Sequence, residues 1–386
     1  MFEIDEERIP IKVWTDTVDP EALGQARNLA NLPWAFHHIA LMPDVHAGFG
    51  MPIGGVLATT GVVIPNAVGV DIGCGMNAVR TSLEDIDRSE LRRIFEDLGS
   101  AVPVGFTHHR DPQSWSGFDD APDVPVVQRE LDSARYQLGS LGGGNHFIEL
   151  QKGDDGHVWV MLHSGSRNFG YTIAKEFYRI AKEGAVRRGL KLRDIQLAPL
   201  FLEGGEESAA GQYLLAMGFA QDFAAASRAR MLDRVREILT RYFPRIHFDG
   251  EVNIHHNFAS REEHFGREVV VHRKGATSAR AGERGIIPGS QGTHSYIVEG
   301  LGNPDSFQSC SHGAGRVMGR REAQKKLDLG KEKAWMDRRG ILHNLKSVKD
   351  LDEAAGAYKN IGDVMKNQKD LVRVLVELSP LAVRKG

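Results

Sequence analysis

The chain has 386 residues, of which 41% are hydrophobic and 26% charged, a composition typical of a globular protein with a large buried core. Its formal net charge of −3 excludes a protein that binds nucleic acid through a globally basic surface, so any such contact must rest on a local patch. Only two cysteines are present, the N-terminus MFEIDEERIP has no signal-like region, and no run of about 18 apolar residues occurs, so we expect a cytoplasmic protein without a disulfide framework or membrane contact.

Strand and helix patterns follow one another along the chain. Residues 37–81 carry β-branched residues between Gly and Pro breaks, which predicts several strands. A polar loop is expected over 101–125 and a strand over 157–163. Helices are predicted at 87–99, 126–139, 169–188 and 207–243. Later strands are predicted at 251–256 and 267–276, in RGIIPG and in SYIVEG, and later helices near 315–327 and 361–378.

Strands near both ends of the chain bracket a helical middle, and this order favours an α+β fold. The sequence contains no internal repeat, low-complexity tract or linker. We therefore predict a single domain over residues 1–386, with a helical insertion at approximately 169–245.

The segment VGVDIGCGMN places Asp71 and Cys74 three residues apart on a Gly-rich turn after an apolar strand. A carboxylate and a thiolate in this arrangement can face one cation, and a thiolate can bridge two. Taken alone, the pair is more often a turn-forming Asp and a small buried Cys. GCGMNA also fits a dinucleotide-binding pattern, but a strand is expected after it instead of the required helix, which argues against an oxidoreductase.

Four histidines lie at strand ends or Gly-rich turns: His146 after LGSLGGGN, His163 in MLHSGSR, His256 in EVNIHHN and His312 in SCSHGAGR. One such histidine would usually be a core or turn residue, but four together with the Asp and Cys favour a metal-dependent phosphoryl or nucleotidyl enzyme. We expect His312 at the start of a helix, facing the place where a phosphate would be held. Asp44 and His46, in MPDVHAGFG, are an intermediate case.

The local basic patch is predicted in VHRKGATSARAGERG, which contains four basic residues: Arg273, Lys274, Arg280 and Arg284. Arg316 lies four residues after His312 and is a candidate for phosphate contact, because a guanidinium matches phosphate oxygens. Arg320 and Arg321 are expected on the solvated surface.

These segments, together with RKGATSARAG, IIPGSQGT and the C-terminal AVRKG, resemble the RtcB family of RNA ligases nearly from end to end and in order. The likeness is greater to the shorter bacterial members. The resemblance implies an RtcB-type domain with mixed β-sheets around a metal-binding cleft. It also implies two Mn²⁺ ions and GTP as cofactors, and RNA with a 3′-phosphate or 2′,3′-cyclic phosphate and a 5′-hydroxyl as substrates. It leaves open the need for an archease-type activator.

Matched position by position, the resemblance makes His312 the nucleophile that becomes guanylylated. The resemblance also implies that five residues bind the two metal ions: Asp71, Cys74, His146, His163 and His256. Cys74 would be shared by both ions. GTP or phosphate contacts are expected from Asn145, Glu149, Arg167, Asn257, Ser290, Arg316, Tyr358 and Lys385. Donor chemistry alone would favour Zn²⁺ over Mn²⁺, so manganese rests on the resemblance.

Two positions depart from the family pattern: Asn168 stands where Gly is common, and Gln291 where Met is common. Both adjoin expected nucleotide contacts, so they bear on nucleotide affinity. Two alternatives remain open. The same ions could serve an RNA phosphodiesterase or phosphatase, or the protein could be a non-ligating, nucleotide-binding accessory of RNA repair.

Overall fold

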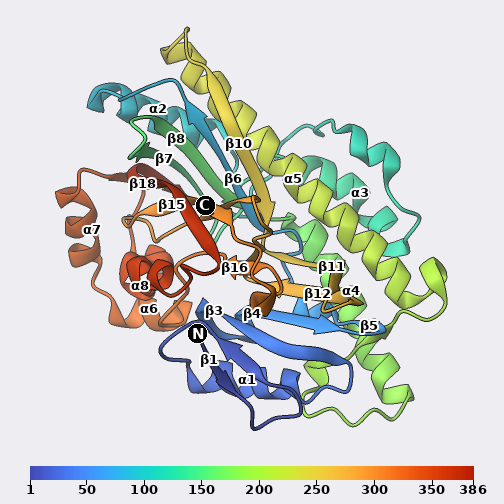
Figure 1. Ribbon diagram of the computed structural model, residues 1–386. Helices are drawn as coiled ribbons and strands as arrows, with labels where there is room; N and C mark the ends of the chain where they lie inside the picture. Colours follow the sequence, from blue (N-terminus) through green and yellow to red (C-terminus); the bar gives the residue numbers. More distant parts are fainter.

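Two large β-sheets organise the structure, a computed structural model that describes residues 1–386. One sheet lies at the bottom of the view in Figure 1 and the other at the upper left, with the longest helices on the right. Segments that link the sheets, among them β16 (Ser309–Ser311), lie between them. Ends of several strands therefore lie near the middle of the molecule, close to β16 (Figure 1).

The first sheet has six strands in the order β1-β2-β3-β4-β12-β11. Their bounds are Phe2–Ile4, Ile11–Val13, Ala35–Phe49, Met51–Thr59, Arg267–Lys274 and Asn257–His264 in that order. The β11–β12 hairpin turns through Phe265 and Gly266, both at positive φ, as a two-residue hairpin turn requires. All pairs are antiparallel except β2–β3.

The second sheet runs β10-β6-β8-β7-β18-β15-β14, and β10 and β14 approach each other so that it nearly closes. The bounds in that order are Phe248–His255, Gly75–Thr81, Val158–Ser164, Phe147–Gly153, Val372–Lys385, Ser295–Gly300 and Arg284–Ile287. Short strand β17 (Leu342–His343) pairs with β18 in parallel. Two small ladders join β13 (Ala276–Ser278) to β16, and β5 (Val62–Val63) to β9 (Leu200–Phe201).

Eight α-helices surround the sheets. They are α1 Pro20–Ala30, α2 Arg88–Ala101, α3 Pro125–Gln137, α4 Arg167–Arg187, α5 Ala209–Tyr242, α6 Arg320–Lys326, α7 Leu329–Arg338 and α8 Ile361–Lys366. The longest, α5, begins where the Ser208 side chain accepts a hydrogen bond from the Gly211 amide. None of the helices is both long and apolar enough to span a bilayer.

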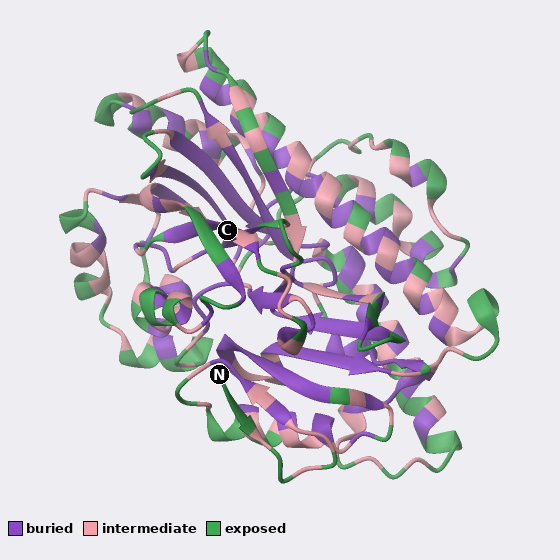
Figure 2. Cartoon of the chain, viewed as in Figure 1, coloured by how far each residue is buried: buried purple, intermediate pink, exposed green.

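Helix α5 packs across β6, β8 and β10, three neighbouring strands of the second sheet. Its residues Met231, Leu232 and Val235 are fully buried in one core cluster with Val79 of β6 and Val160 of β8. Figure 2 shows buried strands of this sheet beside the long helix, whose outer side is partly exposed. The apolar contact fixes α5 against the sheet, and so fixes any polar side chain that it points toward the strand ends.

The predicted α+β class with mixed sheets is confirmed, and the helices predicted at 87–99, 126–139, 169–188 and 207–243 are present as α2, α3, α4 and α5. A strand, β6, follows GCG as expected, so the dinucleotide pattern lacks its helix. The division into one domain with a helical insertion over 169–245 stays a prediction.

The helix predicted over 361–378 is wrong beyond Lys366. Strand β18 occupies Val372–Lys385 because VRVLVEL pairs with β15 and the following residues, 378–385, pair with β7 on the other edge. Pro380 would normally break such a strand, but it sits where the register with β7 shifts. Pairing with these two strands along successive halves of β18 outweighs the helix propensity of its Leu and Glu residues.

The helix predicted near 315–327 begins only at Arg320. His312 therefore does not stand at a helix N-terminus. It follows β16 directly and precedes the bend Gly313–Ala314–Gly315. Gly315 has a positive φ and packs so closely on the Asp44 backbone that a Cβ would collide with it.

Candidate active site

Five side chains predicted to bind metal come together where four adjacent strands of the second sheet end. Strand order β10-β6-β8-β7 explains the convergence, because each of these strands carries or adjoins a candidate ligand. Asp71 and Cys74 lie in the turn before β6, and His163 is in β8. His146 immediately precedes β7, and His256 immediately follows β10.

The donor atoms form two groups that share one thiol: Cys74, His163 and His256, and Asp71, Cys74 and His146. The Cys74 Sγ lies 3.2 Å from Nε2 of His163, which lies 3.3 Å from Nε2 of His256. In the second group, Nε2 of His146 lies 3.5 Å from Sγ and 3.2 Å from Oδ2 of Asp71. Donors bound to one tetrahedral ion at 2.0–2.3 Å lie roughly 3.3–3.8 Å apart, so both groups have the spacing of a metal site.

The electrostatics of the cluster also suit cations. Burial, together with neighbouring imidazoles, holds the pKa values of His163 and His256 well below the ordinary value, so both rings are neutral and carry a lone pair. Burial raises the pKa of the Cys74 thiol, so a thiolate at this position needs a bound cation to stabilise it. The residues present therefore fit divalent metal ions.

The backbone orients one of these ligands. Nδ1 of His163 lies 2.9 Å from the carbonyl oxygen of Asn145, so the Nδ1–H donates to that oxygen and the Nε2 lone pair faces the cluster. Asn145 thus orients a candidate ligand through its backbone carbonyl, and it is also one of the residues that line a cavity described below. Nδ1 of His256 is buried and has no hydrogen-bond partner.

His312 lies against this cluster, with its ring centre 4.9 Å from that of His256. Its Nδ1 lies 2.6 Å from Oδ2 of Asp44, which also accepts a 3.1 Å hydrogen bond from the His312 backbone amide. Burial opposes ionisation of Asp44, but the charge and the hydrogen bond of His312 hold its pKa below the ordinary value. A carboxylate at Nδ1 leaves Nε2 as the nitrogen with a free lone pair.

A cavity of about 290 Å³ opens beside His312. Its lining consists of His46, Ile53, Asn145, Phe147, His163, Pro288, Gly289, His312, Gly313, Ala314, Gly315, Arg316, Arg320 and Tyr358. The cavity thus borders one candidate metal ligand, His163, and the turn after β16. Burial lowers the pKa of His46 to about 4, so its imidazole is neutral here.

Beside this cavity, Arg316 and Tyr358 belong to one network around the buried carboxylate of Glu353. Arg316 Nη1 donates to Glu353 at 2.9 Å, and Arg320 Nε donates to its other oxygen at 2.8 Å. The Tyr358 hydroxyl donates to Glu353 as well. Because Glu353 and two backbone carbonyls engage Arg316, its guanidinium is held in place at the cavity wall.

Arg320 was predicted to be a solvated surface residue, and its side chain is indeed 54% exposed. It also pairs with Glu353 and lines the cavity beside His312, which the prediction did not include. It also lines a second cavity, of about 720 Å³, together with Asp71 and Arg167. The segment between β16 and α6 bends, so that Arg320 lines the same cavity as His312. Their separation in the sequence does not predict this.

Arg167 begins α4 with an unusual positive φ of 58°. Its side chain is partly buried and donates to the Gly105 carbonyl at 3.0 Å, while Nη1 lies 3.5 Å from Nδ1 of His146. It fills the space over Gly142, where any Cβ would collide with it. Strained non-Gly backbone of this kind persists where surrounding contacts impose it, which is common at functional sites.

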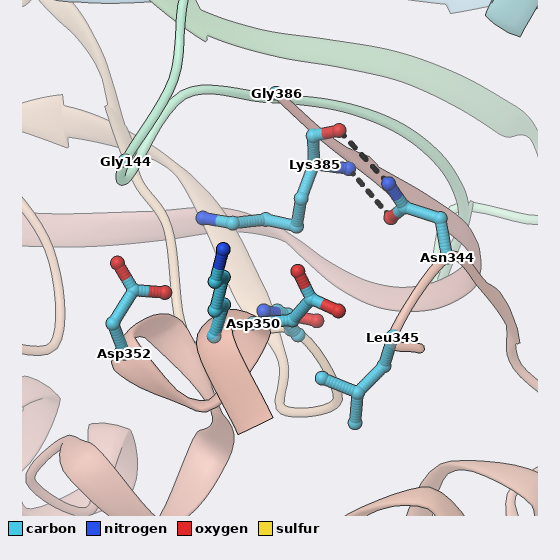
Figure 3. Close-up of a pocket in the computed structure, with 9 residues that line it drawn as sticks. Gly144, Asn344, Leu345, Asp350, Asp352, Lys385 and Gly386 are labelled. Carbon is cyan, nitrogen blue, oxygen red and sulfur yellow. Dashed lines mark hydrogen bonds between the residues drawn. The ribbon is translucent and has the colours of Figure 1, made fainter. Parts of the chain in front are cut away.

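Lys385 lies in a third cavity, of about 160 Å³, shown in Figure 3. Its main chain is fixed by paired hydrogen bonds with the Asn344 amide, at 2.9 and 3.0 Å. Its side chain extends across the cavity on the side of Asp352 (Figure 3). Burial lowers the pKa of Lys385, against the raising effect of Glu353, Asp352 and Glu149. Gln291, a departure from the family pattern, lines the same cavity.

The other predicted nucleotide contacts lie in differing surroundings. Burial raises the pKa of Glu149 to about 8, so its carboxyl group, bonded to Gln151, is neutral at pH 7. Ser290 lies with Tyr358 at a neighbouring cavity of about 760 Å³. The Asn257 amide is used within the protein: it donates to the Asp71 carbonyl at 3.1 Å and accepts from the Gly275 amide at 2.8 Å.

The predicted basic patch at 271–285 is wrong for half of its members. Arg273 is fully buried and pairs with Glu262, and buried Lys274 donates to the carbonyls of Phe49 and Asn66. Arg273 and Lys274 are consecutive on β12 and so point to opposite faces of the sheet, and both faces are covered at this end of the strand. Only Arg280 and Arg284 are exposed.

Sequence reasoning assigned no function to Asp44, whose pairing with His312 spans 268 residues. The available signal was its place beside His46 in a Gly-rich segment. Neither residue has a pattern that reveals a partner so far along the chain.

The fold and the site together define a mixed α/β protein with a His, Cys and Asp cluster suited to metal. Residues 25–386 match the family described as "tRNA-splicing ligase RtcB". The chain is 42% identical to the RNA-splicing ligase RtcB of Escherichia coli over 98% of both chains. It is 32% identical to the tRNA-splicing ligase RtcB of Thermococcus kodakarensis, over 98% of this chain and 95% of that one. The chain therefore belongs to the RtcB family of RNA ligases.

We expect Asp44→Asn to slow any reaction at His312 by about a hundredfold or more, because an amide cannot favour the required tautomer of the ring. Fold and metal content should stay unchanged, since the amide has nearly the same shape. The measurement is the rate of covalent nucleotide transfer to the protein at saturating GTP and Mn²⁺. A rate within a factor of about three of the unmodified protein would show that Asp44 does not orient His312.

Proposed function

We propose that this protein joins RNA 3′-phosphate or 2′,3′-cyclic phosphate ends to 5′-hydroxyl ends, using GTP and a guanylylated His312. The observation that carries the proposal is the placement of His312. Its Nδ1 is held by Asp44, and its ring lies against the metal-type cluster at the edge of a cavity. A histidine placed in this way can attack through Nε2, beside a site for an anionic substrate.

The proposed chemistry has three balanced transfers. His312 Nε2 attacks the α-phosphorus of GTP, forming a P–N bond as pyrophosphate leaves. An RNA 3′-phosphate oxygen then attacks that phosphorus, which releases the imidazole and leaves RNA capped by a 3′–5′ guanylyl pyrophosphate. Finally the 5′-hydroxyl of the second strand attacks the RNA 3′-phosphorus, and GMP leaves as the phosphodiester forms. A cyclic phosphate is first hydrolysed to the 3′-phosphate.

We propose Asp71, Cys74, His146, His163 and His256 as ligands of two Mn²⁺ ions. When bound, these ions would neutralise charge on the phosphates and so lower the barrier to attack by a neutral imidazole. The membership of Cys74 in both donor groups supports a shared thiolate.

For the nucleotide we propose the cavity beside His312, with Asn145, Arg316 and Tyr358 along its wall. Ser290 and Lys385, which line the adjoining cavities, would lie toward the base. Glu149 is buried and acts on the charge of Lys385, so it would contribute from behind that lysine. Asn257 is better placed to hold the ligand turn, because its amide is already engaged by two backbone groups.

For RNA we propose the cavity that contains Arg167, Arg320 and Asp71. Two aromatic side chains line it with substantial exposure, Phe106 at 101% and Tyr171 at 43%. A base can stack on an exposed aromatic ring next to a cation that contacts phosphate, as is common for single strands. A cytoplasmic location and an archease-type activator stay predictions.

The proposal is tested by end specificity. A strand with a 3′-phosphate or cyclic phosphate should join a 5′-hydroxyl strand when GTP and Mn²⁺ are present. Strands with 3′-hydroxyl and 5′-phosphate should not join with any nucleotide, since no lysine-nucleophile motif is present in the sequence. The products are read on a denaturing gel with one end-labelled strand.

Each other result has a distinct meaning. Efficient joining of 3′-hydroxyl to 5′-phosphate ends, or joining driven by ATP alone, would refute the proposal. Opening of the cyclic phosphate without joining would favour the phosphodiesterase alternative. Nucleotide binding with no change to RNA would favour the non-ligating accessory.

A further inference from the structure

Helix α5 buries a charged side chain against the strand ends that carry the candidate metal ligands. Arg228 is 0% exposed, and each of its contacts is with an uncharged group. A guanidinium stays ionised at any ordinary pH, and burying it without a carboxylate is costly. Its position therefore calls for an explanation beyond the packing of α5.

The contacts of Arg228 converge on three adjacent strands. Its Nη1 donates to the Gly73 carbonyl at 2.9 Å and to the Ser164 carbonyl at 3.0 Å. Its Nη2 lies 3.1 Å from Nδ1 of His255. Its Nε donates to Oδ1 of Asn253 at 2.8 Å. These partners belong to the ends of β6, β8 and β10.

Three of the four partners are sequence neighbours of candidate ligands. Gly73 precedes Cys74, Ser164 follows His163, and His255 precedes His256. These three ligands form one of the two donor groups. A single planar guanidinium thus ties together the backbone segments on which that whole group is mounted.

We propose that Arg228 is the positioning residue that sets the spacing of Cys74, His163 and His256 before a metal ion binds. Its rigid fork of N–H groups fixes three strand ends relative to one another. The metal ligands on those ends are then already ordered, so metal binding does not have to supply the free energy of ordering them. This inference rests on the proposed metal-binding role of the cluster.

Lysine cannot replace this function. An ammonium group keeps the charge, but its donors radiate from one atom and cannot span the Gly73, Ser164 and Asn253 acceptors at once. We expect Arg228→Lys to weaken metal binding by about 10- to 100-fold, the usual cost of losing a group that orients metal ligands.

The matched control is Arg273→Lys. Arg273 is also 0% exposed, and it donates to Ser309 and to the Phe307 carbonyl, but none of its partners adjoins a candidate ligand. Both substitutions should lower the melting temperature of the metal-free protein, because each removes buried hydrogen bonds. Only Arg228→Lys should also change metal affinity.

The readout is a Co²⁺ titration of the metal-free full chain, followed by the thiolate-to-cobalt charge-transfer absorption. Unlike activity, this signal reports the Cys74 group itself. A Co²⁺ affinity of Arg228→Lys within about twofold of the unmodified protein, with stability reduced as in Arg273→Lys, would overturn the inference and reduce Arg228 to a structural role.

If Arg228→Lys does not fold, Asn253→Ala decides the matter. Asn253 is exposed and holds only Nε of the guanidinium, so its loss should loosen Arg228 and lower Co²⁺ affinity by about threefold in a folded protein. Unchanged affinity would then count against the inference. An unmodified protein that shows no thiolate–cobalt band would refute the proposed metal site itself, a result separate from any effect of Arg228.

Discussion

His312→Ala is expected to abolish covalent attachment of GMP, with a loss of at least about a thousandfold, while the protein still folds and binds GTP. The side chain is mostly buried beside Asp44. Alanine leaves a small space at the cavity wall and removes the Nδ1 bond to Asp44 of β3, but the bond from the backbone amide to Asp44 remains. The measurement uses GTP labelled at the α-phosphorus, with Mn²⁺. In the unmodified protein the label should be lost in acid and kept in base, as for a phosphoramidate.

A second assay separates the nucleophile from the rest of the site. His312→Ala should still join RNA that already bears a 3′-terminal guanylyl pyrophosphate to a 5′-hydroxyl strand, because that step needs no histidine–GMP. The control is His294→Ala, which changes a half-exposed histidine outside the cavity and should be labelled normally. Label retained by His312→Ala would move the nucleophile to another imidazole, first to His46 on the same cavity wall.

The candidate ligands could be predicted from sequence because their signal is local. Cys74, His146 and His256 each stand next to a Gly-rich turn or a strand end that is visible in a few residues. Strands β10, β6, β8 and β7 are neighbours, so residues at their corresponding ends meet without any special loop. Local patterns and one sheet edge were sufficient to bring these side chains together.

The supporting groups could not be predicted because their signal lies in long-range pairs. Asp44 acts on His312 across 268 residues, and Arg228 reaches Gly73 across 155. Before the fold is known, nothing separates Arg228 from the other arginines of an Arg-rich helix. The same holds for Arg273: a run of basic residues predicts surface, although the strand that carries it lies between two others. Burial of charge depends on the partner strands, and a sequence window does not contain them.

Strand β18 shows the same limit for secondary structure. Its Leu and Glu residues favour a helix, and its alternating valines favour a strand, so local propensity is divided. Pairing with β7 and β15 decides between them, and it places Lys385 in the cavity of Figure 3. The role predicted for Lys385 came from the C-terminal motif AVRKG. The position of this lysine in the cavity depends on β18 being a strand, which local sequence did not predict.

Cys74→Ala is expected to remove metal from both donor groups at once, whereas His146→Ala should affect only the group that contains Asp71. The physical reason is the shared thiol: a thiolate that bridges two ions is a ligand of each, and a three-donor group without it keeps only two. After gel filtration, we expect about two Mn²⁺ per chain in the unmodified protein, about one in His146→Ala and about none in Cys74→Ala, measured by mass spectrometry of the metals. Guanylylation by Cys74→Ala should fall below detection.

The matched control is Cys310→Ala, because Cys310 is also buried, at 1% exposure, but belongs to neither donor group. Both alanine substitutions remove one buried sulfur, so any common loss of stability reflects packing, and only Cys74→Ala should lose metal. Repeating the measurement with Zn²⁺ tests the site independently of the choice of ion, since thiolate and imidazole donors bind Zn²⁺ more tightly than Mn²⁺. Equal metal content in Cys74→Ala and Cys310→Ala, with either ion, would contradict a thiolate shared by two ions and would leave Cys74 as a packing residue.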